Sequence, residues 1–469
     1  MWYLWAVRRV HIIAIGGSVM HALAIALQKQ GYRVSGSDDR IEDPARQRLQ
    51  EAGLLPEAPG WNPDRITPDI DLVIVGRHAL PDNPELQKTQ ALGLPITDMP
   101  TFIAEASRAK HRITIIGSHG KTTTTALLLY AFQQLHLPTD WLLGAPPRSD
   151  LPTLSLSSAP TIILEGDEYP ASAWNLQPKA AVYKPHWLLF TGMAWDHANV
   201  YPTPQSYEAA FALLLDQLPK GGLCVYNETD LAVRRLVEKH LRPGWHYLRP
   251  YGMLPYFIKQ GTWYVRVGRR ITPVRFWGRH NVLNAAAVWK LLQEFWVEDE
   301  TFAQILSTFS LPAGRQTIWY QSPELVVIRD FAHAPSKVQA TLSALRETFP
   351  HHRILAALEL HTYSSFLPAF LKNYRAALRT AHERWFYVEP TLRRSRGIQG
   401  LETLQSALPL RRSRWFEDKA ALVAALRARL KQGPLVVVLM SSGTFSGLKP
   451  EELGLEGLKQ IDQSGFATS

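Results

Sequence analysis

Apolar runs, short turns and amphipathic stretches follow one another along this chain in a regular order. The first unit has an apolar run at residues 10–15, a Gly16-Gly17 turn, a helical period at residues 20–29 and a short apolar run at residues 33–35. This order is typical of parallel strands whose connecting helices cover the sheet. The pattern therefore predicts an α/β fold.

The same order returns twice more. A second unit opens near residue 107, and its strand, loop and helix are predicted at residues 112–116, 117–121 and 123–134. A third opens near residue 311, with a helix predicted at residues 337–346 and strands at residues 325–328, 353–358 and 435–439. We therefore expect three α/β domains, at residues 1–107, 108–312 and 313–469.

Composition narrows the class of protein. The chain has 469 residues and a single cysteine, Cys224, so it has no internal disulfide framework and fits a reducing compartment. No run approaches the roughly 20 apolar residues that span a bilayer, and residues 1–10 are interpreted as a short extension of the first strand rather than a signal peptide. A cytoplasmic protein without a membrane partner is predicted. The net charge of +10 comes from scattered basic residues, which favours a solvated surface over a nucleic-acid site.

The first glycine turn is followed by Ser37 and Asp38 at the end of the second predicted strand. In dinucleotide-binding folds such a turn holds phosphates at a helix N-terminus, and the acidic residue binds a ribose. The full G-x-G-x-x-G spacing is absent here, so a plain structural turn explains the pattern about equally well.

The strongest local signal is Gly117-Ser118-His119-Gly120-Lys121-Thr122, between a predicted strand and a predicted helix. Backbone N–H groups and the helix N-terminus can surround a phosphate there, Lys121 adds a positive charge, and Thr122 can bind Mg²⁺. The segment is therefore predicted to bind a nucleotide.

Polar residues follow several other predicted strands. Glu165, Asp167 and Glu168 come after an apolar run at residues 160–164, and three carboxylates at a strand end suit a hard cation. Asp196-His197 lies beyond another run, at residues 187–190. Each acid could equally cap a helix or face solvent in a turn.

Two later segments carry groups that can contact a nucleoside. Asn281 and Asn284 are three residues apart and would share one face of a helix, where their amides could bind an adenine edge. An N-cap asparagine with an exposed partner is the structural alternative. Asp330 follows a strand in the third domain, where it could hold ribose hydroxyls.

Taken together, the order of these motifs resembles that of the ATP-dependent Mur ligases over essentially the whole chain: G-S-H-G-K-T, E-G-D-E-Y, D-H, G-R-H-N-x-x-N-A and D-F-A-H-x-P. The resemblance implies a Rossmann-like UDP-sugar domain, a central P-loop ATPase domain and a Rossmann-like acceptor domain. It also implies amide-bond formation through an acyl phosphate, with ATP and Mg²⁺.

The resemblance assigns roles residue by residue. It places ATP on Gly117, Ser118, His119, Gly120, Lys121, Thr122, Thr123, His280, Asn281, Asn284, Arg315 and Asp330. It places one Mg²⁺ on Thr122 and a second on Glu165 and His197, and it places the UDP-sugar on Gly16, Gly17, Ser37 and Asp38. Lys121, Glu165, His197 and His333 are the implied catalytic residues, His333 as the residue that would orient the amine.

The G-x-H-G-K-T form is similar to the branch that acts on UDP-N-acetylmuramate. Four details resemble the murein tripeptide ligases rather than the L-alanine-adding enzymes: Val19 in the first turn, residues 165–169, residues 195–199, and the late segment M-S-S-G-T-F-S-G at residues 440–447. The predicted acceptor is therefore L-Ala-γ-D-Glu-meso-diaminopimelate, with L-alanine as the alternative.

Some positions depart from the family pattern. Residues 359–365 match the acceptor motif of neither group and lack its arginine, Arg329 stands where an aspartate commonly precedes Asp330, and Ala334 replaces a common histidine. An inactive binding homologue is the alternative of another class, although the retained phosphate-loop and metal-ligand residues argue against it. No oligomeric state is predicted.

Overall fold

The computed structural model describes residues 8–77, 79–148, 150–197 and 200–455. Its contacts divide the chain into two compact units, one of Met1–Met193 with Glu208–Gly252 and the other of Ala194–Tyr207 with Met253–Ser469. In the part of the chain that the structure describes, no helix is both long and apolar enough to cross a bilayer.

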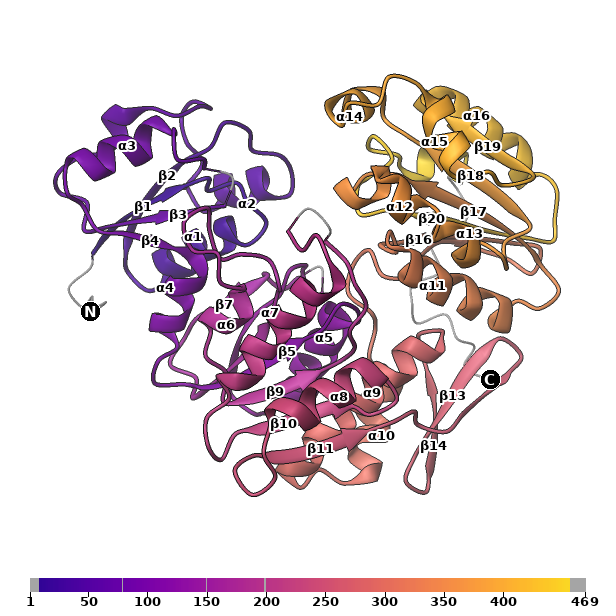
Figure 1. The fold of residues 1–469 in the computed structure, drawn as a ribbon, viewed down its shortest axis with the longest axis horizontal. Helices are drawn as coiled ribbons and strands as arrows, with labels where there is room; N and C mark the ends of the chain where they lie inside the picture. Colours follow the sequence, from indigo (N-terminus) through magenta and orange to yellow (C-terminus); the bar gives the residue numbers. More distant parts are fainter. Residues whose placement is uncertain (1–7, 78, 149, 198–199, 456–469) are drawn as a thin grey trace. The chain divides into compact units, whose positions relative to one another are not determined.

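The N-terminal part of the first unit is a four-stranded parallel sheet in the order β2-β1-β3-β4 (Figure 1). Its strands are β1 Arg9–Ile13, β2 Arg33–Ser37, β3 Leu72–Val75 and β4 Ile96–Asp98. Its helices are α1 Met20–Lys29, α2 Ala45–Glu51, α3 Pro84–Ala91 and α4 Met99–Ala106, with a 3-10 turn η1 at Pro63–Arg65.

The rest of the first unit is built on a seven-stranded sheet in the order β11-β10-β9-β5-β8-β6-β7, in which β7 alone runs antiparallel to its neighbour. The strands are β5 His111–Ile116, β6 Thr139–Leu142, β7 Leu154–Ser155, β8 Thr161–Glu165, β9 Trp187–Phe190, β10 Leu223–Asn227 and β11 Tyr247–Tyr251. The helices are α5 Lys121–Gln134, α6 Lys179–Val182, α8 Leu231–His240 and, from Glu208 onward, α7 Pro204–Asp216.

One apolar core joins these two sheets. Leu23 and Ile74 of the small sheet layer belong to the same buried cluster as Leu142, Ile162 and Leu164 of the large sheet. Burial of this apolar area is the main force that holds the two layers together.

The second unit contains an antiparallel three-stranded sheet that the sequence did not lead us to expect. Its strands are β12 Tyr256–Lys259, β13 Thr262–Val267 and β14 Arg270–Val274. Trp263 is fully buried, and its indole N–H donates to Thr348 Oγ1 at 2.9 Å. Helices α9 Arg279–Leu292 and α10 Asp299–Thr308 follow, with a 3-10 turn η2 at Gln293–Phe295 between them.

The C-terminal sheet of the second unit has the order β15-β16-β20-β17-β18-β19, and only β15 is antiparallel to its neighbour. Its strands are β15 Thr317–Gln321, β16 Leu325–Asp330, β17 Arg353–Glu359, β18 Glu383–Tyr387, β19 Ser413–Phe416 and β20 Leu435–Met440. Its helices are α11 Pro335–Thr348, α12 Pro368–Leu371, α13 Tyr374–Ala377, α14 Pro390–Ser395, α15 Leu401–Ala407 and α16 Lys419–Leu430, with 3-10 turns η3 at Tyr363–Phe366 and η4 at Pro450–Leu453.

The predicted α/β architecture with three sheet-based domains is confirmed. The strands near residues 10, 112, 325, 353 and 435 all form within one or two residues of their predicted bounds. The exact domain boundaries stay a prediction, and most of the expected extension of the first strand lies outside the described residues.

Candidate functional site

The phosphate-loop motif connects the carboxyl end of β5 to the first turn of α5. Gly117 has φ +131°, and a Cβ there would come within 2.3 Å of Thr191 Oγ1 and 2.8 Å of Gly192 O. Gly120 precedes the helix with φ +76°. Only glycine adopts both conformations without strain, so the two glycines fix the loop around the N-terminus of α5.

Neighbouring backbone groups hold the loop in this shape. Ser118 N donates to Gly192 O at 2.9 Å, and Thr191 Oγ1 donates to the carbonyls of Ile116 and His119. Ser118 and Thr123 are buried, whereas His119 and Gly120 are partly exposed. The loop is therefore preformed, with its tip open to a ligand.

Lys121, in the first turn of α5, lies inside this loop. Its Nζ donates to Gly117 O at 2.6 Å and pairs with Glu168 Oε2 at 2.5 Å. Burial alone would lower the pKa of Lys121, but the carboxylates of Glu168 and Asp167 outweigh burial and raise that pKa. Lys121 is therefore positively charged, and Glu168 holds it where a phosphate would lie.

Thr122 and Glu165 form the second half of this arrangement. Thr122 Oγ1 donates to Glu165 Oε1 at 2.7 Å, and Gly144 N donates to Glu165 Oε2 at 2.8 Å. A hydroxyl and a carboxylate oxygen side by side are ligands that Mg²⁺ accepts, because Mg²⁺ takes one or two protein oxygens and completes its shell with phosphate and water. The chemistry of these donors fits Mg²⁺.

The expected cluster of three carboxylates after β8 does not form. Asp167 pairs with Lys179 at 2.9 Å and Glu168 pairs with Lys121, so only Glu165 stays beside Thr122. Within the described ranges, no group of three or more His, Cys, Asp or Glu side chains is arranged to hold a metal. The three carboxylates therefore have three different partners, Lys179, Lys121 and Thr122.

A cavity of about 640 Å³ opens beside the first glycine turn. Gly16, Gly17 and Asp38 line it from the small sheet, and Gly144 and Thr153 line it from the large sheet. Asp38 Oδ2 accepts the N–H of Gly16 at 2.7 Å, and burial raises the pKa of Asp38. Three of the four residues predicted for the UDP-sugar therefore share one cavity wall.

Ser37 is the fourth, and the structure places it elsewhere. Its side chain is fully buried, and its hydroxyl donates to Glu85, whose carboxylate also accepts from His11 and from Asn62 N. Burial alone would raise the pKa of Glu85, but its hydrogen bonds outweigh burial and lower that pKa. The Ser37 side chain thus belongs to a buried network and does not line the cavity, and its assignment to the UDP-sugar stays a prediction.

In the second unit, Asp196 and His197 lie next to α11. Asp196 is 5% exposed, accepts the N–H of His197 at 2.7 Å and lies 3.5 Å from Lys337 Nζ. Burial alone would raise the pKa of Asp196, but nearby positive charge, chiefly that of Lys337, together with the hydrogen bond from His197 N outweighs burial and lowers that pKa. His197 has φ +57°, a conformation that is uncommon outside glycine. Glu165 and His197 belong to different units, so their shared metal site stays a prediction.

The residues predicted for adenine lie at the start of α9. Asn281 Nδ2 donates to Trp277 O at 2.9 Å, and Asn284 Nδ2 lies 3.3 Å from Asn281 Oδ1. Both asparagines are buried, and burial lowers the pKa of His280. The two amides share one helix face, as predicted from their spacing, and each already donates one of its two N–H groups within the protein.

Arg315, Asp330 and His333 come together near the end of β16. Asp330 Oδ2 accepts from Thr341 Oγ1 at 2.9 Å, and the Arg315 guanidinium lies 4.2 Å from the centre of the Phe331 ring. His333 Nδ1 donates to Phe331 O at 2.8 Å, and burial lowers the pKa of His333 to about 3. A neutral His333 can therefore accept a hydrogen bond from an amine but is a weak base.

Arg329, noted above as a departure from the family pattern, organises the loop after β20. Its guanidinium donates to Leu439 O at 3.1 Å and to Ser441 O at 3.3 Å, and it also reaches Gly443 O. From the other side, Glu359 accepts Phe445 N at 2.9 Å and the hydroxyl of Ser441. We call residues 441–447 the β20 loop; Arg329 is occupied by carbonyls and acts as a structural residue there.

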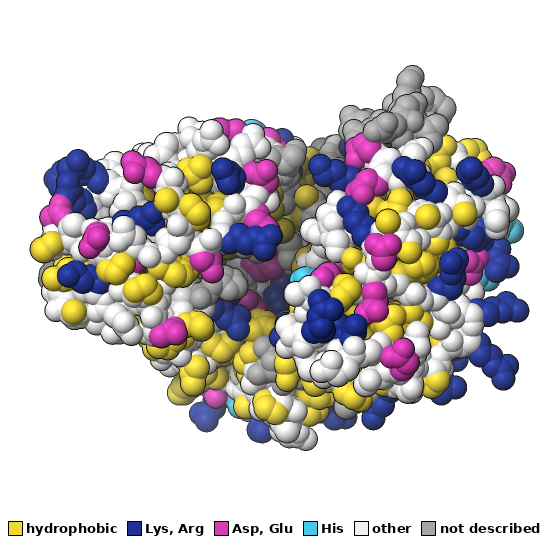
Figure 2. Space-filling view, turned by 90° about the horizontal axis from the view of Figure 1, so that it is seen from above, with side chains coloured by type: hydrophobic (Ala, Val, Ile, Leu, Met, Phe, Trp, Pro, Cys, Tyr) yellow, Lys and Arg dark blue, Asp and Glu magenta, His cyan; other side chains and the backbone are white. Residues whose placement is uncertain are grey.

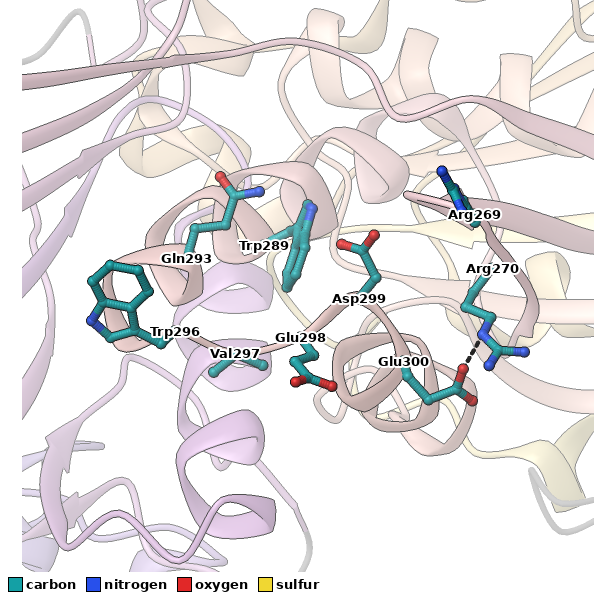
Figure 3. A pocket seen from close by; sticks show the side chains of 9 residues that line it. All are labelled: Arg269, Arg270, Trp289, Gln293, Trp296, Val297, Glu298, Asp299 and Glu300. Atoms are coloured by element: carbon teal, nitrogen blue, oxygen red, sulfur yellow. Dashed lines mark ion pairs between the residues drawn. The ribbon is translucent and has the colours of Figure 1, made fainter.

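Two other surface features, the distribution of charge and a second hollow, do not involve the residues predicted from the motifs. Basic and acidic side chains are both scattered over the face in Figure 2. A second hollow, of about 580 Å³, is lined by Trp289, Trp296 and Asp299 and by the ion pair of Arg270 with Glu300 (Figure 3). None of the residues predicted from the motifs lines it.

Sequence reasoning missed several contacts that build the site. Glu168 as the partner of Lys121, Gly144 as a donor to Glu165, and Lys337 as the partner of Asp196 were not foreseen. Each partner lies far from its mate in the sequence. The sequence shows that Glu168 and Lys337 are charged, but charge alone does not identify the residue with which each one pairs.

Comparisons with known proteins agree with the motifs. Profiles described as Mur ligase family, catalytic domain, as Mur ligase middle domain, and as Mur ligase, glutamate ligase domain match residues 9–111, 115–292 and 314–443. The UDP-N-acetylmuramate–L-alanine ligase of Halorhodospira halophila is 30% identical over 376 residues, which are 76% of this chain and 74% of that protein. The Bordetella avium enzyme of the same name is 28% identical and covers 96% of this chain and 98% of its own.

Solved structures share the fold. A murein peptide ligase from Psychrobacter arcticus superposes with a TM-score of 0.69 at 20% identity and covers 95% of this chain and 98% of its own. The UDP-N-acetylmuramate-alanine ligase of Thermotoga maritima superposes with a TM-score of 0.71 at 20% identity and covers 94% of this chain and 96% of its own. Together, the profiles, the sequence relatives and the phosphate loop show that this chain belongs to the Mur ligase family and is an ATP-dependent ligase of peptidoglycan metabolism.

Proposed function

We propose that this protein joins the carboxylate of UDP-N-acetylmuramate to the amine of L-Ala-γ-D-Glu-meso-diaminopimelate. One observation supports this most directly. Gly144 lines the cavity beside the first glycine turn and donates to Glu165, which in turn accepts from Thr122 of the phosphate loop. A sugar nucleotide in that cavity would thus end beside the residues that hold ATP, where its carboxylate can meet the γ-phosphoryl group.

The reaction has two steps. A carboxylate oxygen of the sugar attacks the γ-phosphorus of ATP, the bond to the β-phosphate oxygen breaks, and ADP leaves an acyl phosphate behind. The acceptor amine then attacks the carbonyl carbon, loses a proton and expels phosphate, which forms the amide. Lys121 and the N–H groups of residues 117–122 hold the phosphates in line and offset their charge, which is the main contribution a protein makes to phosphoryl transfer.

By the family pattern one Mg²⁺ is assigned to Thr122 and a second to Glu165 and His197; the Thr122 and Glu165 oxygens lie 2.7 Å apart. When bound, the ion would offset negative charge on the transferred phosphoryl group. His280, Asn281 and Asn284 are proposed for adenine, Arg315 for the ATP phosphates and Asp330 for the ribose. His333, held by Phe331 O through Nδ1, orients the amine through its other nitrogen.

The choice of acceptor rests on chemistry at the carboxyl edge of the C-terminal sheet. In open α/β sheets ligands bind beyond the carboxyl ends of the strands, and α12 and α14, which follow β17 and β18, lie there together with the β20 loop (Figure 1). The usual acceptor arginine is missing from residues 359–365. Arg329 cannot replace it, because carbonyls occupy its guanidinium.

Two arginines of the α14 region are suited to this role. Arg393 is buried and anchors the region through Glu417 at 2.6 Å and Ile398 O at 2.7 Å. Arg394 and Arg396 are exposed, and among the described residues neither has a carboxylate within ion-pair distance. The Arg396 guanidinium lies 5.4 Å from the Tyr363 ring centre, next to the acceptor segment. The tripeptide carries three carboxylates and L-alanine one, so these cations favour the tripeptide.

Replacing both Arg394 and Arg396 with alanine is expected to raise KM for the tripeptide about 10- to 100-fold, because charge-assisted hydrogen bonds to carboxylates are lost. The KM for UDP-N-acetylmuramate should stay unchanged. Arg375, a basic residue in α13, gives the control variant Arg375→Ala. An unchanged tripeptide KM in the double variant would contradict the role of α14.

L-alanine is the second candidate acceptor, because the relatives that match by sequence are named UDP-N-acetylmuramate–L-alanine ligases. Phosphate release with ATP and UDP-N-acetylmuramate separates the two. Turnover with the tripeptide and not with L-alanine supports the proposal, whereas turnover with L-alanine alone overturns it in favour of the second candidate. No phosphate release with either acceptor would support an inactive binding homologue. A cytoplasmic location is part of the same proposal.

A further inference from the structure

The cavity beside the first glycine turn is lined by more acids than bases. Asp38, Asp39, Glu42 and Asp43 contribute carboxylates, and Arg40 and Arg48 contribute the two guanidinium groups. Arg40 is exposed and paired with Glu42. Arg48, on α2, has no carboxylate within ion-pair distance among the residues described. The carboxylates of this lining would repel an anionic ligand unless the positive charge of Arg48 offset the negative charge of the ligand.

His21, on α1, lies beside Arg48. The imidazole is 3% exposed, Nδ1 donates to Gly17 O at 2.8 Å, and Nε2 lies 3.5 Å from Arg48 Nη1. With its proton on Nδ1, the ring presents a lone pair on Nε2 to the guanidinium. Burial lowers the pKa of His21, so the ring stays neutral and can accept from Arg48. The same ring thus connects the glycine turn to the cation across the cavity.

We propose that Arg48 binds the anionic oxygens of the sugar nucleotide and that His21 positions Arg48 for this contact. This inference rests on the proposed function, because it takes the sugar nucleotide as the occupant of the cavity. The carboxylates of the lining can then accept hydrogen bonds from the hydroxyl groups of the ligand. Asp38 is held in place for this by the hydrogen bond from Gly16 N. The anionic oxygens can belong to the diphosphate or to the muramyl carboxylate.

Calorimetric binding of UDP-N-acetylmuramate to the full chain tests the proposal. Arg48→Ala should raise Kd about 10- to 100-fold, the factor expected for a lost charge-assisted contact, and Arg48→Lys should recover part of it. Arg46→Ala is the matched control, because Arg46 is an exposed arginine of the same helix that does not line the cavity. It should leave Kd within about twofold.

His21→Asn isolates the positioning role. Asparagine can keep the donation to Gly17 O but has no group at the place of Nε2. We expect Kd to rise about 3- to 10-fold in His21→Asn and no further in His21→Asn with Arg48→Ala than in Arg48→Ala alone, because both changes remove one interaction. Additive losses would mean that His21 acts only on the fold and would overturn its positioning role.

Competition with UDP locates the anion. Equal weakening of UDP and UDP-N-acetylmuramate in Arg48→Ala places the contact at the diphosphate, and weakening of UDP-N-acetylmuramate alone places it at the carboxylate. An unchanged Kd in Arg48→Ala overturns the inference while the proposed function stands. Failure of the unaltered protein to bind UDP-N-acetylmuramate would instead count against the proposed function.

Discussion

Lys121→Ala is expected to lower the rate of ADP formation at least 100- to 1,000-fold, the effect typical of removing one preorganised charge from a transition state. Lys121 is partly buried against Gly117 O and Glu168 inside the phosphate loop, so its loss removes the positive charge that the loop holds. The Kd for UDP-N-acetylmuramate should stay within about twofold, because that ligand is assigned to the glycine-turn cavity. Steady-state ADP release and calorimetry measure the two quantities.

The variant leaves Glu168 buried without its cation, which could destabilise the fold. Lys121→Ala combined with Glu168→Gln removes that charge, and this double variant should fold and be equally inactive. Lys179→Ala is the control, since Lys179 pairs with Asp167 in the same region without touching the loop. An active Lys121→Ala enzyme would show that the loop does not carry the reaction.

Glu165→Gln is expected to lower kcat about 100-fold or more and to raise the Mg²⁺ concentration needed for half-maximal rate. Gln keeps the size of the side chain and one oxygen that can accept from Thr122 or Gly144, but it removes the negative charge that holds the ion. A magnesium titration of phosphate release measures both effects. The structural change is small, so the melting temperature should move little.

Asp167→Asn serves as the control, because Asp167 also follows β8 but is paired with Lys179. Its magnesium dependence should match that of the unaltered enzyme. If Glu165→Gln had the same magnesium dependence as Asp167→Asn, Glu165 would not be a metal ligand.

The sequence predicted those features whose cause is local. Residues 117–122 combine two glycines with a Lys-Thr pair between a strand and a helix, and the loop forms there with both glycines at positive φ. The helix begins at Lys121 rather than at Thr123, because Gly120 already provides the turn. The spacing of Asn281 and Asn284 likewise places them on one helix face.

A local signal was also overlooked. Trp263, Val265 and Val267 are buried while the residues between them face outward, which is the period of a strand. Gln260 and Gly261 both have positive φ, as a two-residue hairpin turn requires. The antiparallel sheet β12-β13-β14 could therefore have been predicted from these residues.

Other features depend on contacts between distant segments and could not be predicted from the sequence. Ser37 turns into the core because Glu85, 48 residues away, accepts its hydroxyl. Arg329 is a structural residue because the β20 loop, more than 100 residues later, offers its carbonyls. A single sequence identifies such residues as polar or charged, but it does not show which distant residues their side chains contact in the fold.

The central claim is that the carboxylate of UDP-N-acetylmuramate attacks ATP to form an acyl phosphate. We would label both carboxylate oxygens with ¹⁸O, supply ATP and the tripeptide, and analyse the released phosphate by mass spectrometry. The account predicts one ¹⁸O atom in each phosphate, because the amine displaces phosphate together with the oxygen that attacked ATP. Phosphate without ¹⁸O would mean that water attacks ATP, and that result would contradict the account.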